Sequence, residues 1–318
     1  MKNKKTLMFF SSILILIFHF WINIFERNTV YFEIETFIRQ ICFIGVDIFF
    51  FLSAFSISKQ EIKDYPKFIF NRFKKVYLLY LIFSVIAFIY FKWDLKYFIE
   101  TIISIRLFID GGGSFLWFVP AIMLIYILLP LYNKIEVNNK ILTPLITIIV
   151  WLIFTVIISL FTPYKEIFIL TNRIPIILIG DYFAKYNIFE KLNKKQQLIS
   201  TSILITIGIF ILYRFLNYNI PFINDALYLF AIPFTLGLIF LINLISPNKI
   251  INKLGSITLE IYGIQMIFGY KITSVIFETI NKPFLTNILT IISMILIAYV
   301  FNKIIKFLFY KKAMNYEK

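Results

Sequence analysis

The sequence has little of several residue types on which soluble proteins, metal sites and disulfide scaffolds depend. Only 15% of its 318 residues are charged, whereas a soluble domain carries about 25%. Its single cysteine, Cys42, excludes an intramolecular disulfide, and one Cys with one His leaves too few ligands for a structural zinc site. Gly and Pro number only 10 each, which excludes collagen-like repeats and low-complexity disorder. We therefore expect no metal site.

Most of the sequence consists of long apolar runs. Hydrophobic residues make up 60% of the chain, and short charged clusters separate runs of about 17 to 25 residues, the length that spans a bilayer. Such runs fold as helices, because lipid offers no partner to a free backbone group. The sequence predicts an all-α, polytopic membrane helix bundle in the cell (plasma or inner) membrane, with residues 1–318 as a single membrane-embedded domain. The ten predicted spans are 7–25, 39–58, 76–92, 115–133, 141–161, 173–187, 197–214, 224–245, 256–275 and 284–309.

Two stretches need a separate interpretation. The Lys-rich residues 1–6 precede an apolar run, as in a signal peptide, but the run is long and no small-residue cleavage site follows it, which predicts a retained first span. Between the third and fourth spans, residues 93–110 are predicted to hold a short interfacial helix before Gly111.

The distribution of Lys and Arg predicts the orientation. The formal net charge is +15, and positive residues accumulate in cytoplasmic loops. With the N-terminus inside, 22 of the 32 basic residues fall in inner segments and 10 in outer segments. This bias predicts both termini in the cytoplasm. No stretch is long enough to form a soluble basic face, so we expect no nucleic-acid partner.

Polar side chains inside predicted spans are candidate functional residues, because lipid makes them costly. His19, the only histidine, lies twelve residues into the first span, or about 18 Å from the inner boundary. Asp47 lies eight residues beyond Arg39, about 12 Å below the outer boundary and therefore at a similar depth. Adjacent helices would bring the two together, as a carboxylate that orients a general base. The alternatives are a packed histidine and a structural hydrogen bond between helices.

Other candidates are less specific. Ser53 lies about 9 Å deeper than Asp47, which disfavours it as a nucleophile for His19. Arg72, Lys74 and Lys75 end the first predicted inner loop. These three residues are either topogenic charge or a binding site for a phosphate-bearing ligand.

The segment GVDIFFFLSAF at 45–55 is similar to the pattern G-V-D-x-F-F-x-x-S-G-F. This pattern is the second-helix signature of the acyltransferase-3 family of multi-pass membrane acyltransferases, and the segment is the most specific of six motifs that together resemble this family. The other five, in family order, are His19 late in the first helix, RFKKVY at 72–77, LWFVP at 116–120, Arg173-Ile174-Pro175 with Gly180, and SITLEIY at 256–262. The chain departs from the pattern at three positions. They are Met8, where the family commonly has Arg; Ala54, in place of Gly; and Gln265, in place of a late His.

The resemblance implies acyl transfer from acetyl-CoA, or another acyl-CoA, at the cytoplasmic side to a hydroxyl of a surface glycan or lipid-linked sugar. His19 would be the general base and Asp47 would orient it. The donor phosphates would bind Arg72, Lys74 and Lys75. Arg173 and Trp117 would shape the substrate pocket, and Arg173 would steady the oxyanion.

Two other classes of function fit the same features. A transporter, flippase or export subunit for a glycan or lipid-linked intermediate would also need buried Asp and Arg residues, but would tolerate a mild change at His19. A structural subunit of a polysaccharide assembly would tolerate loss of both His19 and Asp47.

Overall fold

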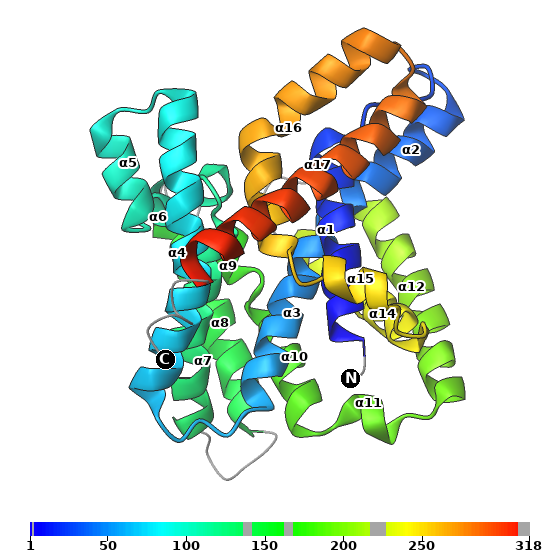
Figure 1. Cartoon of the computed structure of the whole chain (residues 1–318). Helices are drawn as coiled ribbons and strands as arrows, with labels where there is room; N and C mark the ends of the chain where they lie inside the picture. Colours follow the sequence, from blue (N-terminus) through cyan, green and yellow to red (C-terminus); the bar gives the residue numbers. More distant parts are fainter. Residues whose placement is uncertain (2, 136–141, 162–167, 217–226, 311–318) are drawn as a thin grey trace. The chain divides into compact units, whose positions relative to one another are not determined.

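The computed structural model describes residues 1, 3–135, 142–161, 168–216 and 227–310, and every element in these ranges is helical (Figure 1). The prediction of an all-α fold is therefore confirmed. Each of the ten predicted spans overlaps a helix, although residue 141 and residues 224–226, at the starts of two spans, lie outside the described part. Among the described residues, four segments are long and apolar enough to cross a membrane, and two shorter helices are also apolar. The four are Val30–Ser58, Tyr65–Phe91, Lys194–Arg214 and Pro283–Leu308, and the shorter two are Phe118–Lys134 and Ile232–Leu244. The total of ten crossings and their orientation stay predictions.

The helices belong to two compact units. One unit is Val46–Ile245 with Met1, and the other combines Lys2–Gly45 with Ser246–Lys318. The first unit holds α3 (Ile44–Ser58) from Val46 onward, α4 (Tyr65–Phe91), α5 (Leu95–Ile102), α6 (Arg106–Asp110), η1 (Gly111–Gly113), α7 (Phe118–Ile135), α8 (Leu142–Phe161), α9 (Phe168–Thr171), α10 (Ile174–Lys185), α11 (Ile188–Lys191), α12 (Lys194–Leu216), α13 (Leu227–Phe230) and α14 (Ile232–Leu244). The second holds α1 (Lys4–Phe20), α2 (Val30–Ile41), α15 (Lys249–Leu254), α16 (Thr258–Ile280), α17 (Pro283–Ile305) and η3 (Lys306–Tyr310).

Within the first unit, α3, α7 and α10 run parallel. Their N-terminal halves meet where Trp117, just before α7, lies beside Arg173, just before α10, and where Phe118 packs on Phe50 of α3. Their last turns meet where Asn133 of α7 bonds to Ser58 of α3. These contacts agree with the predicted alternation, in which the second, fourth and sixth spans all run inward.

Helix α4 begins earlier than the sequence reading placed it. The predicted span starts at 76, but the helix starts at Tyr65, eleven residues before it. The Asp64 side chain accepts a hydrogen bond from the Lys67 N–H, and Pro66 occupies the first turn, so the N-terminus is well capped. Basic residues 72, 74 and 75 therefore lie on a helix and not at the end of a loop, which corrects the prediction.

In the second unit, α1 ends at Phe20 and not near residue 25. Trp21 leaves the helix in an extended conformation, and the Glu35 carboxylate accepts hydrogen bonds from Trp21 Nε1 and from the N–H groups of Ile24 and Phe25. Glu35 lies on α2, a helix that the sequence reading did not predict. The sequence reading missed α2 because this helix is too short, and carries too many charged residues, to be a membrane span by itself.

Helices α16 and α17 form a hairpin, drawn in orange and red in Figure 1. Asn281 ends α16 in the left-handed conformation, and Pro283 starts α17. The Asn287 side chain on α17 bonds to both the N–H and the carbonyl of Ile22. The chain segment after α1 is thereby fixed to α17.

Candidate active site

A buried ion pair joins α3 to α10 in the first unit. The Arg173 Nε lies 2.9 Å from Asp47 Oδ1, and each side chain is only 2% exposed. Asp47 is in the first turn of α3, and Arg173 is the N-cap residue of α10. The second carboxylate oxygen, Asp47 Oδ2, is buried and makes no hydrogen bond within the described residues. Charges this deeply buried are costly unless paired, so the arrangement marks a candidate functional centre.

Aromatic rings cover the guanidinium group of Arg173. Its Cζ atom lies 5.1 Å from the centroid of Trp117 and 6.0 Å from that of Phe50, which is within cation–π range. Trp117 is 8% exposed, so the rings shield the ion pair. The structure thus brings together three residues that the sequence singled out separately: Asp47, Trp117 and Arg173.

Close helix packing holds this centre together. A Cβ atom on Gly180 of α10 would lie 2.6 Å from the carbonyl oxygen of Phe51 on α3. Only glycine allows the two backbones to approach so closely. Pro175 follows Arg173 at the start of α10, where its missing N–H costs no hydrogen bond. The R-x-P and Gly positions of one motif therefore place Arg173 against α3.

A second polar cluster lies at the other ends of the same helices. Ser58 donates to Asp181 and accepts from Asn133, whose side chain also accepts from Lys185 at 3.0 Å. Lys185 Nζ lies 2.9 Å from Asp181. The sequence analysis did not identify this cluster. The i, i+4 spacing of Asp181 and Lys185 was the available signal.

The three predicted donor-binding residues differ in their surroundings. Arg72 bonds to Gln60 Oε1 at 2.9 Å, and its Cζ lies 5.5 Å from the Tyr126 ring of α7. Lys74 and Lys75 are exposed on α4. Arg72 therefore contacts neighbouring parts of the first unit, whereas the side chains of Lys74 and Lys75 are exposed.

His19 lies in the second unit, in the last turn of α1. Its side chain is exposed, and its ring lies between those of Phe18, at 5.0 Å, and Phe20, at 5.9 Å. Phe20 in turn packs against Gly269, where a Cβ would approach its ring to 2.3 Å. The exposed imidazole is thus available to a ligand. The pairing of His19 with Asp47 stays a prediction.

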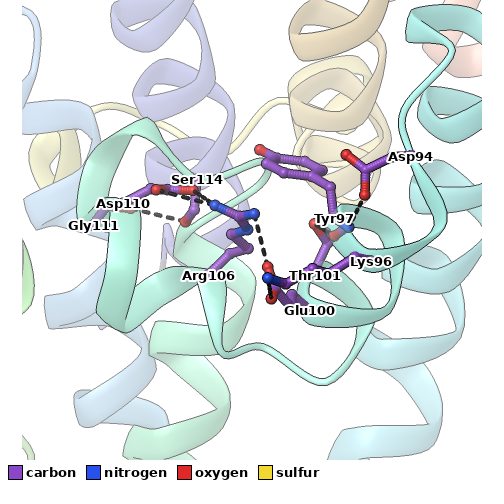
Figure 2. Close-up of polar contacts among 9 residues, drawn as sticks. All are labelled: Asp94, Lys96, Tyr97, Glu100, Thr101, Arg106, Asp110, Gly111 and Ser114. Carbon is purple, nitrogen blue, oxygen red and sulfur yellow. Dashed lines mark hydrogen bonds and ion pairs between the residues drawn. The ribbon is translucent and has the colours of Figure 1, made fainter.

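The predicted interfacial stretch consists of two short helices, α5 and α6, joined by an arginine. Figure 2 shows Arg106 between the Glu100 carboxylate, at 2.7 Å, and that of Asp110, at 3.1 Å. Its Cζ also lies 4.2 Å from the Tyr97 ring. Burial lowers the pKa of Arg106, but Asp110 and Glu100 raise it more, so it lies above its ordinary value. These contacts all lie within fifteen residues and close the turn between the two helices.

In the described part of the chain, no group of three or more His, Cys, Asp or Glu side chains is placed to hold a metal ion.

A family model described as an acyltransferase domain matches residues 7–303, almost the whole chain. The chain belongs to the acyltransferase-3 family. No curated protein and no solved structure matches it. The match covers both compact units, and with them His19, Asp47, Trp117 and Arg173. Family and apolar helices together indicate a membrane protein with acyltransferase activity.

Proposed function

We propose that this acyltransferase moves an acetyl group, or another acyl group, from acyl-CoA on the cytoplasmic side to a hydroxyl of a surface glycan or lipid-linked sugar. The observation that carries the proposal is the family match over residues 7–303. In this reaction the acceptor oxygen forms a bond to the thioester carbonyl carbon, the carbon–sulfur bond breaks, and CoA leaves as the free thiol.

His19 acts as the general base in this proposal. Its imidazole takes the acceptor proton as the acceptor oxygen attacks, and returns a proton to the departing CoA sulfur. An exposed side chain suits this role, because a general base must reach the acceptor. Asp47 orients the imidazole. Its Oδ2 atom, buried without a hydrogen-bond partner among the described residues, is able to accept one more bond.

Arg173 and Trp117 form the polar and aromatic wall of the substrate pocket in this proposal. The transition state carries negative charge on the former carbonyl oxygen, and a buried guanidinium group stabilises such charge strongly. Arg173 is 2% exposed and held in place by Asp47, so it needs little reorganisation. Arg72, with Lys74 and Lys75, binds the donor phosphates. Arg72 is the best positioned of the three, because Gln60 and the Tyr126 ring already orient it.

The test compares wild type with His19→Ala in nanodiscs. The readouts are hydrolysis of radiolabelled acetyl-CoA and transfer of the label to a crude cell-envelope glycan. We expect the rates of hydrolysis and transfer to fall about a hundredfold or more in the variant, which is the usual effect of removing a general base. Lys271→Gln, an exposed change on α16, is the matched control and should keep wild-type activity.

Two results would contradict the proposal. Equal activity of wild type and His19→Ala would make the histidine structural. If wild type neither binds nor consumes acetyl-CoA with glycan present, a transporter or flippase becomes the better explanation. Monodisperse elution of every variant separates these outcomes from misfolding.

A further inference from the structure

Three lysines of the second unit converge on one tyrosine. Tyr299 and Lys303 lie one helical turn apart on α17, and Lys306 follows at the start of η3. Lys253 comes from α15, a separate helix, and its Nζ lies 4.9 Å from the centroid of the Tyr299 ring. Lys303 Nζ lies 5.8 Å from the same centroid. Lys306 is seven residues beyond Tyr299, about two turns along the same side of the helix. We call Lys253, Lys303 and Lys306 the lysine cluster.

No carboxylate balances this charge within the described residues. None of the three ammonium groups takes part in an ion pair there. The acidic residue at the start of α16, Glu260, is 4% exposed and accepts a hydrogen bond from the Asn302 side chain. Ammonium groups that share one aromatic ring repel one another, so an anion bound among them would relieve the repulsion.

The lysine cluster lies at the end of the unit where α1 begins. The Lys5 carbonyl packs against Gly255, directly after α15, so tightly that a Cβ there would overlap it. Thr6 Oγ1 also donates to Asn252 Oδ1 at 3.1 Å. By the predicted orientation this end faces the cytoplasm, where anionic lipid headgroups and acyl-CoA are both present.

We propose that the lysine cluster binds a phosphate ester, with the Tyr299 hydroxyl as an additional hydrogen-bond donor. Lysine binds phosphate as a point charge, so three lysines together suit an anionic phosphate ester. Two ligands carry this chemistry, an anionic phospholipid headgroup and the nucleotide part of acyl-CoA. His19 lies fourteen residues beyond Lys5, about 21 Å along α1, so a donor bound here would need its long pantetheine arm to reach the imidazole. That second identity rests on the proposed function and would make the lysine cluster the donor site in place of Arg72, Lys74 and Lys75. The phosphate site itself does not rest on the proposed function.

The experiment uses the full chain and two probes. Coenzyme A is titrated onto protein in phosphatidylcholine nanodiscs, and retention of phosphatidylglycerol against phosphatidylcholine is measured by native mass spectrometry. The site variant is Lys253→Gln with Lys303→Gln and Lys306→Gln. The matched control is Lys191→Gln with Lys194→Gln and Lys195→Gln, three exposed lysines of the first unit on the same predicted side. A third variant, the Arg protein, is Lys253→Arg with Lys303→Arg and Lys306→Arg, and it keeps the charge.

We expect the site variant to lose about tenfold or more in affinity for one of the two probes, while the control and the Arg protein keep theirs. Binding should also weaken as salt is raised. Loss of coenzyme A binding identifies the donor as the ligand, and loss of phosphatidylglycerol retention identifies a lipid. The proposal is overturned if the site variant binds both probes like wild type, or if the control loses as much. Acetyl-CoA turnover by wild type, measured separately, tests the proposed function itself.

Discussion

Asp47 and Arg173 form a buried ion pair between two helices of the first unit. Both are 2% exposed, and a buried charge without its partner is strongly destabilising. The sequence marked Asp47 as costly, and the resemblance singled out Arg173 separately. The sequence also predicts that Asp47 pairs with His19, because both lie at a similar depth, and that pairing stays a prediction. Arg173 is 126 residues further along the chain, beyond the reach of any spacing rule.

The buried ion pair of Asp47 and Arg173 lets us predict how substitutions there change stability. Asp47→Ala should lower the free energy of unfolding by about 3 to 5 kcal/mol, because Arg173 would keep a buried, unpaired charge. Asp47→Ala combined with Arg173→Met should recover much of this stability, since neither position then carries a buried charge. Thermal unfolding in detergent measures both. The exposed pair of Lys96 and Glu100 is the control, because Lys96→Gln should cost less than about 1 kcal/mol.

Activity gives an independent check on the same variants. If Arg173 stabilises the oxyanion, the double variant should be folded and inactive. A double variant that is both stable and active would show that the pair is structural only.

Helix α10 shows how a short, charged element is held in an apolar bundle. Polar contacts tie it to α3 at both ends, through Arg173 and Asp47 and through Asp181 and Ser58. Between these contacts Gly180 lets the two backbones touch. A helix of twelve residues is shorter than a membrane span, so these fixed points and not its length determine its position.

Gly180→Ala tests this packing. The added Cβ would meet the Phe51 carbonyl at 2.6 Å, and a backbone atom cannot rotate away as a side chain does. We expect the free energy of unfolding, measured by thermal unfolding, to fall by about 1 to 3 kcal/mol, although alanine has the better helix propensity. Gly113→Ala is the matched control. No atom lies within 4 Å of a Cβ at that position, so its melting temperature should not change. Equal effects of the two changes would contradict the close packing of α3 and α10.

At the scale of the whole molecule, the predicted topology remains the main expectation to test. Contacts within the first unit require α3, α7 and α10 to be parallel, as alternating crossings do. Six of the counted basic residues, Lys2, Lys140, Lys165, Lys311, Lys312 and Lys318, lie outside the described part of the chain. The charge bias therefore comes from the sequence alone.

Cysteine labelling measures the topology directly. Cys42 is the only cysteine and is buried, so Cys42→Ser gives a silent background. A cysteine at Lys96 should react with an impermeant maleimide in intact cells, and one at Lys194 only in inverted vesicles. Three predicted spans separate the two positions, so they should lie on opposite sides. Labelling of both from one side would mean that one of those three helices does not cross.

The sequence by itself determined the class of protein, the helical content and the family. Apolar runs long enough to span a membrane fold as helices. Short motifs such as GVD and R-x-P can be read from one sequence alone and indicate the family. Local capping signals at Asp64 also lay in the sequence, although the hydropathy pattern concealed them. Only the tertiary structure decided which charges meet. The contacts of Asp47 with Arg173, of Ser58 with Asp181, and of Lys253 with Tyr299 join segments far apart in the chain, and packing between helices selects such partners.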